Sequence, residues 1–293
     1  MKVKNKAVFY AILAAALYAI HVPIAKMLLK HAEPTMMAAF LYLGAGIGVC
    51  LYGVFRKKKD QSTDKITKKE WPYVVGMVVL DIIAPILLML GITMTSSANV
   101  SLLNNFEIVA TSVIALMIFK EAISKKLWFA ILFITVASVV LGFEDISAFT
   151  FNKGSLLVLG ACLCWGLENN CTKMLSQRSP VAIVVIKGIF SGLGSLVIAW
   201  MIREQMPAIE WIVCILVLGF VAYGLSIYFY IKAQKYLGAA KTSAFYSVAP
   251  FLGVVFSMLL LWERPKVQFY VALLIMVIGV VFVIKDTKEC KHT

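Results

Sequence analysis

The chain has 293 residues, of which 61% are hydrophobic and only 15% are charged. A soluble domain carries about a quarter of its residues as charged side chains, so this composition excludes an ordinary soluble protein. The formal net charge of +13 would suit a nucleic-acid-binding protein, but the basic residues gather in particular loops between apolar segments. That distribution favours a membrane topology and no nucleic-acid partner.

Ten apolar segments follow one another along the chain. The first could be mistaken for a signal peptide, but it is too long and no small-residue cleavage site precedes the second segment. A helix of about 20 apolar residues crosses the hydrocarbon core, so ten helices use roughly 200 residues and leave short connections. Neighbouring helices are therefore expected to run antiparallel. The segments are 7–29, 34–55, 72–94, 97–119, 127–143, 153–176, 180–202, 210–233, 240–261 and 267–285.

The distribution of lysine and arginine predicts the orientation. With the N-terminus in the cytoplasm, the inner loops and tails hold 19 of these residues and the outer loops hold 5. The longest connection, 56–70, holds seven and is expected to lie beside anionic lipid. Because basic loops stay on the inner side, we predict a multi-pass protein of the cell membrane with both termini in the cytoplasm.

Motifs for enzymes and cofactors are lacking in the sequence. Cys162 and Cys164 have no histidine cluster nearby, so the cysteines are interpreted as small buried hydrophobic residues rather than metal ligands. The phosphate-binding loop of ATPases, the zinc-protease motif and the serine-hydrolase motif are also lacking. We therefore expect no catalytic residue, no metal and no cofactor, and an energy source that is an ion or substrate gradient.

The two halves of the chain repeat each other. At an offset of 147 Lys26 falls on Lys173, and at an offset of 142 Glu121 falls on Glu263. Each half holds five segments, an odd number, so the second half must enter the membrane upside down. We predict two five-helix repeats, 8–143 and 154–285, in an all-α integral membrane protein of ten transmembrane helices. Inverted repeats of this kind commonly build transporters that work by alternating access.

The segments 95–121 (TSSANVSLLNNFEIVATSVIALMIFKE) and 237–265 (LGAAKTSAFYSVAPFLGVVFSMLLLWERP) resemble the EamA-like branch of the drug/metabolite transporter superfamily. In that family the fourth and ninth helices end in an acidic residue, here Glu121 and Glu263. Members carry a proline in the middle of both helices, whereas this chain has Pro250 but Ile108 at the matching place, so the halves need not bend alike. The resemblance implies export or exchange of small metabolites through a central cavity, with the fifth and tenth helices peripheral.

Several polar side chains fall deep inside the apolar segments. An ionisable group at the bilayer centre costs about 2.5–3.5 kcal/mol on insertion scales, so such groups usually face the bundle interior. Lys26 and Lys173, by contrast, lie near span ends and can extend to the membrane surface. The predicted substrate-binding residues are His21, Asp81, Asn104, Glu107, Glu168, Asn170, Lys187 and Tyr246.

Spacing and repeat matches support this choice. Asn104 and Glu107 share one face of a helix. Tyr246 matches Asn104 in the repeat, and His21 matches Glu168. His21 or one of the carboxylates could carry a coupling proton.

Each choice has a structural alternative. Asn104 or Asn170 could tie helices together by hydrogen bonds across the bundle. Lys187 could do no more than neutralise Asp81 or Glu168 in a structural ion pair.

A secondary transporter that exports or exchanges a small polar or amphipathic metabolite is the leading hypothesis. The alternatives are a membrane-embedded enzyme and a passive channel or scaffold. The expected partners are the lipid bilayer, a small-molecule metabolite and a coupling proton, and the sequence leaves open whether the protein forms a homodimer.

Overall fold

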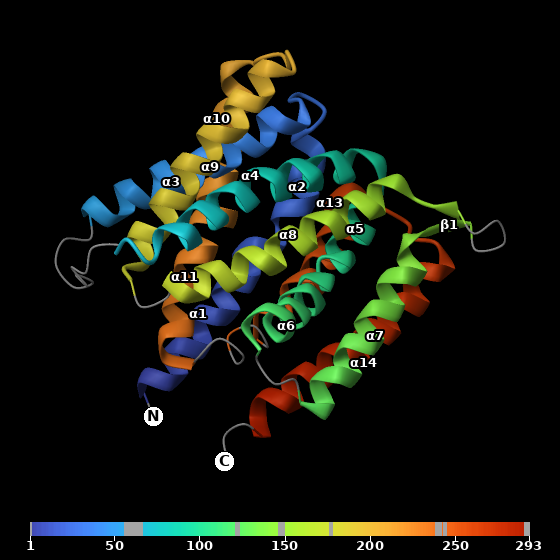
Figure 1. Cartoon of the computed structure of the whole chain (residues 1–293). Coiled ribbons are helices and arrows are strands. Elements are labelled where there is room, and N and C mark those ends of the chain that lie inside the picture. Colours follow the sequence, from blue (N-terminus) through green and yellow to red (C-terminus); the bar gives the residue numbers. More distant parts are fainter. Residues whose placement is uncertain are drawn as a thin grey trace.

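The computed structural model describes residues 2–55, 67–120, 124–145, 150–175, 178–237, 242 and 245–289. The first half contains α1 (Lys2–Ala19), α2 (His21–Leu28), α3 (Pro34–Phe55), α4 (Trp71–Met94), α5 (Ser97–Leu103), α6 (Phe106–Phe119) and α7 (Lys125–Gly142). The second half contains α8 (Lys153–Leu175), α9 (Pro180–Met201), α10 (Ile209–Leu218), the π-helix η1 (Gly219–Leu225), α11 (Ser226–Leu237), α13 (Ala249–Leu261) and α14 (Val267–Glu289). A short antiparallel hairpin, β1 (Phe143–Asp145) with β2 (Thr150–Phe151), joins the halves (Figure 1).

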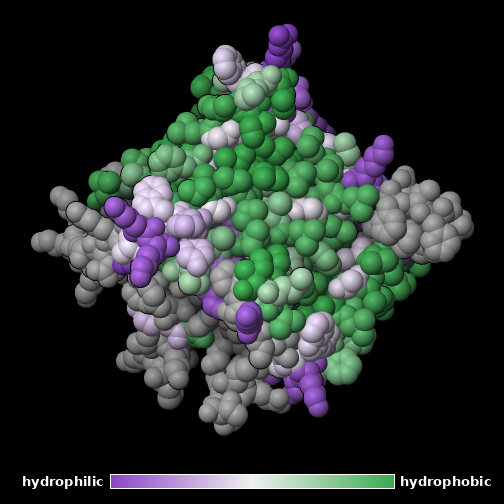
Figure 2. Space-filling view, viewed as in Figure 1, coloured by the Kyte–Doolittle hydropathy of each residue, from purple (hydrophilic) through white to green (hydrophobic). Residues whose placement is uncertain are grey.

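The outside of the helical bundle is apolar. Green hydrophobic side chains cover most of the coloured part of the face that Figure 2 shows. Large side chains such as Met117, Trp200 and Trp262 are 74%, 77% and 86% exposed. Exposure of such side chains is unfavourable in water but favourable in lipid. Within the described residues, six helical segments are long and apolar enough to cross a membrane, and two shorter apolar helices accompany them. The membrane class is therefore confirmed, whereas the count of ten spans stays a prediction.

The two halves pack on each other in pairs that a pseudo-twofold axis would relate. The third predicted segment of the first half, α4, packs along the first predicted segment of the second half, α8. The pair that the axis would relate to it, α1 with α11, is also in contact. Two further pairs join a helix to its own repeat partner: α3 with α9, and α7 with α14. Gly91 lies against Gly154 near one end of the α4–α8 pair and Gly76 lies against Cys171 near the other, so the helices run antiparallel. This arrangement confirms the inverted repeat.

A close crossing of glycines joins α3 to α9. A methyl group added at Gly46 would lie 2.7 Å from the backbone nitrogen of Ile189, and one added at Gly188 would overlap the backbone of Gly46. Small residues of this kind let helix backbones approach closely in membranes, where van der Waals packing replaces the hydrophobic effect between helices.

Helix breaks lie near the centre of the bundle. A turn at Asn104 and Asn105 separates α5 from α6, and a turn at Ser247 and Val248 precedes α13. Both halves therefore interrupt the helix at nearly the same repeat position, although only the second half has Pro250 just after the break. The first predicted helix is also divided, at Ile20, whereas its repeat partner α8 is continuous.

Gly188→Ala should lower the thermal stability of the protein, because the added methyl group must push α3 away from α9. Overpacking of this kind costs about 1–3 kcal/mol. The matched control is Gly160→Ala, where the added carbon would lie 3.4 Å from the flexible Leu87 side chain. Unfolding temperatures of the purified proteins in detergent should fall for Gly188→Ala only, and equal temperatures would contradict the close crossing.

Candidate functional site

Three buried charged side chains meet where α4, α8 and α9 pack together. The Lys187 ammonium lies 3.1 Å from Asp81 Oδ2 and 2.9 Å from Glu168 Oε1. All three side chains are at most 8% exposed. We call Asp81, Glu168 and Lys187 the ion cluster.

Two hydroxyl groups complete the ion cluster. Tyr42 of α3 donates a hydrogen bond of 2.8 Å to Asp81 Oδ1, and Thr172 donates to Glu168 Oε1. Buried ions lose their hydration, so they persist only where opposite charges and hydrogen-bond donors replace the lost water. The ion cluster thus holds three helices from both halves together, and its one cation is shared by two anions.

A fourth charged residue within the apolar segments, Glu107, lies at the start of α6. Asn169 of α8 donates through Nδ2 to Glu107 Oε1 at 2.6 Å and to Thr111 Oγ1 at 3.3 Å. Glu107 and Asn169 are partly exposed, unlike the ion cluster. The Asn169 amide therefore orients the carboxylate without neutralising it.

The neighbouring asparagines differ in their contacts. Asn170 donates through Nδ2 to the Thr111 carbonyl at 3.1 Å and to the Gly166 carbonyl at 2.8 Å, which ties α6 to α8 through backbone. Asn104 lies at the end of α5, where its buried Oδ1 accepts no hydrogen bond from the described residues. Asn170 therefore has the contacts of a helix tie, whereas Asn104 keeps an available acceptor.

Tyrosine rings and His21 lie together next to the ion cluster, since Tyr42 contacts both Asp81 and the Tyr223 ring. The Tyr223 hydroxyl is 3.1 Å from His21 Nε2, and the Tyr18 ring stacks on the His21 ring at 5.7 Å between centroids. The Tyr18 ring is also 5.8 Å from that of Tyr246. The aromatic cluster consists of Tyr18, Tyr42, Tyr223, Tyr230 and Tyr246, linked by ring contacts.

The π-helix η1 presents Tyr223 to His21. Its first residue, Gly219, lies so close to the backbone of Leu41 that any side chain would overlap it. A π-helix is rare and often marks a functional position, because it widens one turn and rotates the side chains that follow. The tight contact at Gly219 and the wider turn together bring the Tyr223 ring into contact with α3 and α1.

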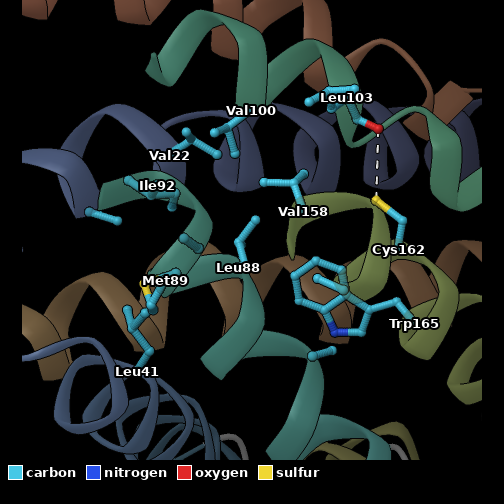
Figure 3. Close-up of a cluster of buried hydrophobic side chains, with 14 of the residues drawn as sticks. Val22, Leu41, Leu88, Met89, Ile92, Val100, Leu103, Val158, Cys162 and Trp165 are labelled. Carbon is cyan, nitrogen blue, oxygen red and sulfur yellow. Dashed lines mark hydrogen bonds between the residues drawn. The ribbon is translucent and has the colours of Figure 1, made fainter. Parts of the chain in front are cut away.

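An apolar layer of packed side chains lies between α2, α4, α5 and α8 (Figure 3). In Figure 3, Val22 of α2, Ile92 of α4, Val100 of α5 and Val158 of α8 converge, and all four are at most 3% exposed. The Cys162 thiol donates to the Leu103 carbonyl at 3.7 Å in the same layer. These residues belong to one buried apolar cluster.

The turn between α4 and α5 carries a set of charge-assisted contacts, which we call the end clamp. The Lys26 ammonium donates to the Ile92 carbonyl and, at 2.6 Å, to the Thr95 carbonyl at the end of α4. The Glu263 carboxylate accepts from the backbone N–H groups of Ser97 and Ala98, each at 2.8 Å. A cation at a helix C-terminus and an anion at a helix N-terminus both complement the helix dipole. The end clamp thus holds the α4–α5 turn between α2 and the segment after α13.

A different ion pair joins the halves near the starts of α4 and α9. Arg178 donates through Nε and Nη2 to the two carboxylate oxygens of Glu70, each at 2.9 Å. The backbone N–H of Thr67 also donates to Glu70, which lowers the pKa of the carboxyl below its ordinary value. Glu70 therefore stays ionised at neutral pH and keeps this two-point contact.

The predicted site residues thus separate into groups. Asp81, Glu168 and Lys187 are in direct contact, as the structural alternative for Lys187 anticipated. His21 and Tyr246 belong with the aromatic cluster, and Glu107, Asn104 and Asn170 lie on or against α5 and α6. Whether any of the eight binds substrate stays a prediction.

The sequence reasoning missed several neighbours of these residues: Tyr18, Tyr42, Tyr223 and Thr172. The glycines that bracket Tyr223, Gly219 and Gly224, were an available signal, since paired glycines in a helix often mark a close approach or a changed helical turn. Nothing local distinguishes Tyr42, whose role follows from its contact with Asp81.

A bundle of inverted helix repeats with charged groups at its centre is the architecture of membrane transport proteins. The chain belongs to the EamA-like transporter family, whose model matches residues 5–143 and 152–285. It is 24% identical over 290 residues to an uncharacterised transporter of Methanothermobacter thermautotrophicus, covering 92% of this chain and 83% of that protein. A solved crystal structure matches with a TM-score of 0.71 at 14% identity and covers 97% of both chains, which shows a shared fold.

Lys187→Met should destabilise the protein, because Asp81 and Glu168 would be left buried without a counter-charge. Removing one partner of a buried ion pair costs about 3–5 kcal/mol. The triple variant Asp81→Asn/Glu168→Gln/Lys187→Met removes all three charges and should recover most of the loss. Thermal unfolding in detergent compares them, and equal unfolding temperatures for the single and triple variants would contradict this role of charge.

Proposed function

We propose that the protein is a secondary active transporter that moves a small polar or amphipathic metabolite out of the cell by alternating access. One observation carries the proposal: the two inverted halves pack around a centre that holds the ion cluster, Glu107 and the aromatic cluster. Charged and polar groups at this depth are costly, and in membrane proteins they commonly mark a substrate or ion path.

The eight predicted residues would serve this function in two ways. The ion cluster and Asn170 hold α4, α6, α8 and α9 in register, so that the centre keeps its shape. Glu107, Asn104, His21 and Tyr246 would contact the substrate, because each offers a polar group or a ring at the interface between the halves. His21 or Glu107 would carry the coupling proton, since each bears an ionisable group that the ion cluster does not neutralise.

The end clamp and the apolar layer support a conformation closed at one end. If the basic loops face the cytoplasm, as the lysine and arginine distribution indicates, the end clamp lies on the outer side. The structure would then represent the state closed toward the outside. Transport requires the contacts of the end clamp to break when the halves rock, so that the α4–α5 turn moves away from α2 and α13.

Loss of the central carboxylates should abolish transport without preventing folding. Proteoliposomes loaded with a defined metabolite mixture, with and without a pH gradient, would be assayed for efflux by mass spectrometry. Glu107→Gln and Glu168→Gln should lose the flux that the unmodified protein supports, whereas Glu210→Gln, an exposed acid at the start of α10, should keep it. Normal flux in both central variants would remove these carboxylates from the mechanism, and no flux of any metabolite in the unmodified protein would refute transport.

A reversible cross-link should show that the clamped end opens. Ser97 Oγ of α5 lies 2.9 Å from Ser257 Oγ of α13, so the double variant Ser97→Cys/Ser257→Cys should form a disulfide under mild oxidation. The oxidised protein should be inactive, and a reducing agent should restore flux. Each single cysteine variant, treated with the same oxidant, is the control. Full flux through the cross-linked protein would contradict opening at this end.

A further inference from the structure

The charges at the centre of the bundle do not balance. Asp81, Glu107 and Glu168 are three acids, whereas the ion cluster supplies one cation, Lys187, which contacts Asp81 and Glu168. Glu107 accepts a hydrogen bond from Asn169 instead. Lys187 already contacts two carboxylates, and Lys26 is engaged by backbone carbonyls at the end clamp. An anionic ligand would therefore meet carboxylates rather than an available cation. The electrostatic character of the site favours a positively charged occupant.

Glu107 offers one oxygen for such an occupant. Its Oε1 accepts the hydrogen bond from Asn169, which fixes the plane of the carboxylate. Its Oε2 accepts no hydrogen bond from the described residues, and Glu107 as a whole is partly exposed. One helical turn earlier, Asn104 Oδ1 is buried without a donor in the described part of the chain. Both positions present acceptors, which complement the N–H groups of an ammonium or amidinium ligand.

Aromatic rings lie beside the helix that ends at Asn104. A carbon added at Gly253 of α13 would lie 2.9 Å from Ser101 Oγ of α5 and 3.3 Å from the carbonyl oxygen of Ala19, the residue after Tyr18 in α1. Ring centroids are 5.8 Å apart for Tyr18 and Tyr246 and 5.0 Å apart for Tyr230 and Tyr246. Tyr18, Tyr230 and Tyr246 are partly exposed, so the surrounding side chains do not cover them fully. Ring faces attract cations and also pack against apolar groups.

We infer that the site takes a small organic cation with an apolar or aromatic body, whose positive group contacts Glu107 Oε2 while its body packs against Tyr18 and Tyr246. The inference rests on the proposed transport function and names the class of substrate. A positive cargo also offsets the excess negative charge that the bundle otherwise keeps at this depth. A zwitterion fits less well, because its carboxylate would have no cation to contact among the described residues of the centre.

The test uses ligands of one shape and different charge. Tryptamine carries an ammonium group on an indole body, indole-3-propionate carries a carboxylate on the same body, and 3-ethylindole is neutral. Isothermal titration and thermal shift of the full-length protein in detergent should show saturable binding of tryptamine, and of a second cation, benzyltrimethylammonium. The anionic and neutral indoles should bind at least about tenfold more weakly.

Matched variants locate the binding. Glu107→Gln should weaken tryptamine binding by at least about tenfold, and Tyr18→Leu should weaken it by a smaller factor of about threefold or more. Glu210→Gln and Tyr270→Leu, at exposed positions, should bind as the unmodified protein does. Gel filtration and the ligand-free unfolding temperature report whether Glu107→Gln and Tyr18→Leu fold. If Glu107→Gln does not fold, Glu107→Asp replaces it and should change the ratio of tryptamine to 3-ethylindole affinity.

The outcomes separate this inference from transport itself. Binding of indole-3-propionate as tight as that of tryptamine, or no saturable binding of either cation, overturns the cation inference. Flux of neutral or anionic metabolites that survives Glu107→Gln also overturns it but leaves transport intact. Glu107-dependent cation binding without any flux would support the ligand class and refute the transport function.

Discussion

The structure depends on how the protein keeps charged groups away from lipid. Lys187 holds two carboxylates at once, and the hydroxyl groups of Tyr42 and Thr172 supply further donors. Because the bilayer offers no water to replace them, these contacts must come from neighbouring helices, which fixes how α3, α4, α8 and α9 pack. The ion cluster therefore maintains the geometry of the centre, whereas Glu107 lies outside the ion cluster and accepts a hydrogen bond from Asn169.

The fold is nearly symmetric, but its centre is not. The helix pairs across the two halves follow a pseudo-twofold axis, yet the residues that this axis relates differ in chemistry. His21 matches Glu168, and Asn104 matches Tyr246. One wall, formed by α6 and α8, consequently presents carboxylates and amides, and the other, formed by α1, η1 and α11, presents rings.

Charged side chains bind the backbone groups at several helix ends. The α4–α5 turn exposes carbonyl groups from one helix and N–H groups from the next, and Lys26 and Glu263 satisfy each kind with a charge of the fitting sign. Glu204 does the same at the start of α3, where it accepts from the N–H groups of Thr35 and Met36. Such charge-assisted contacts are strong when formed, although they involve few atoms. Lys26, which the sequence alone would assign to the membrane surface, thus binds the carbonyl groups at the end of α4.

The sequence by itself determined the membrane class, the two repeats and the set of polar groups inside the spans, because apolar run length, charge distribution and burial cost are local properties. The same local signals could not predict the break at Asn104 and Asn105, since the proline that would mark it is replaced by Ile108. Only the tertiary structure decided that Lys187 meets both Asp81 and Glu168, that Asn169 orients Glu107, and that η1 brings Tyr223 to His21. These contacts join residues far apart in the chain, and they depend on the rotation and register of each packed helix, which no single segment specifies.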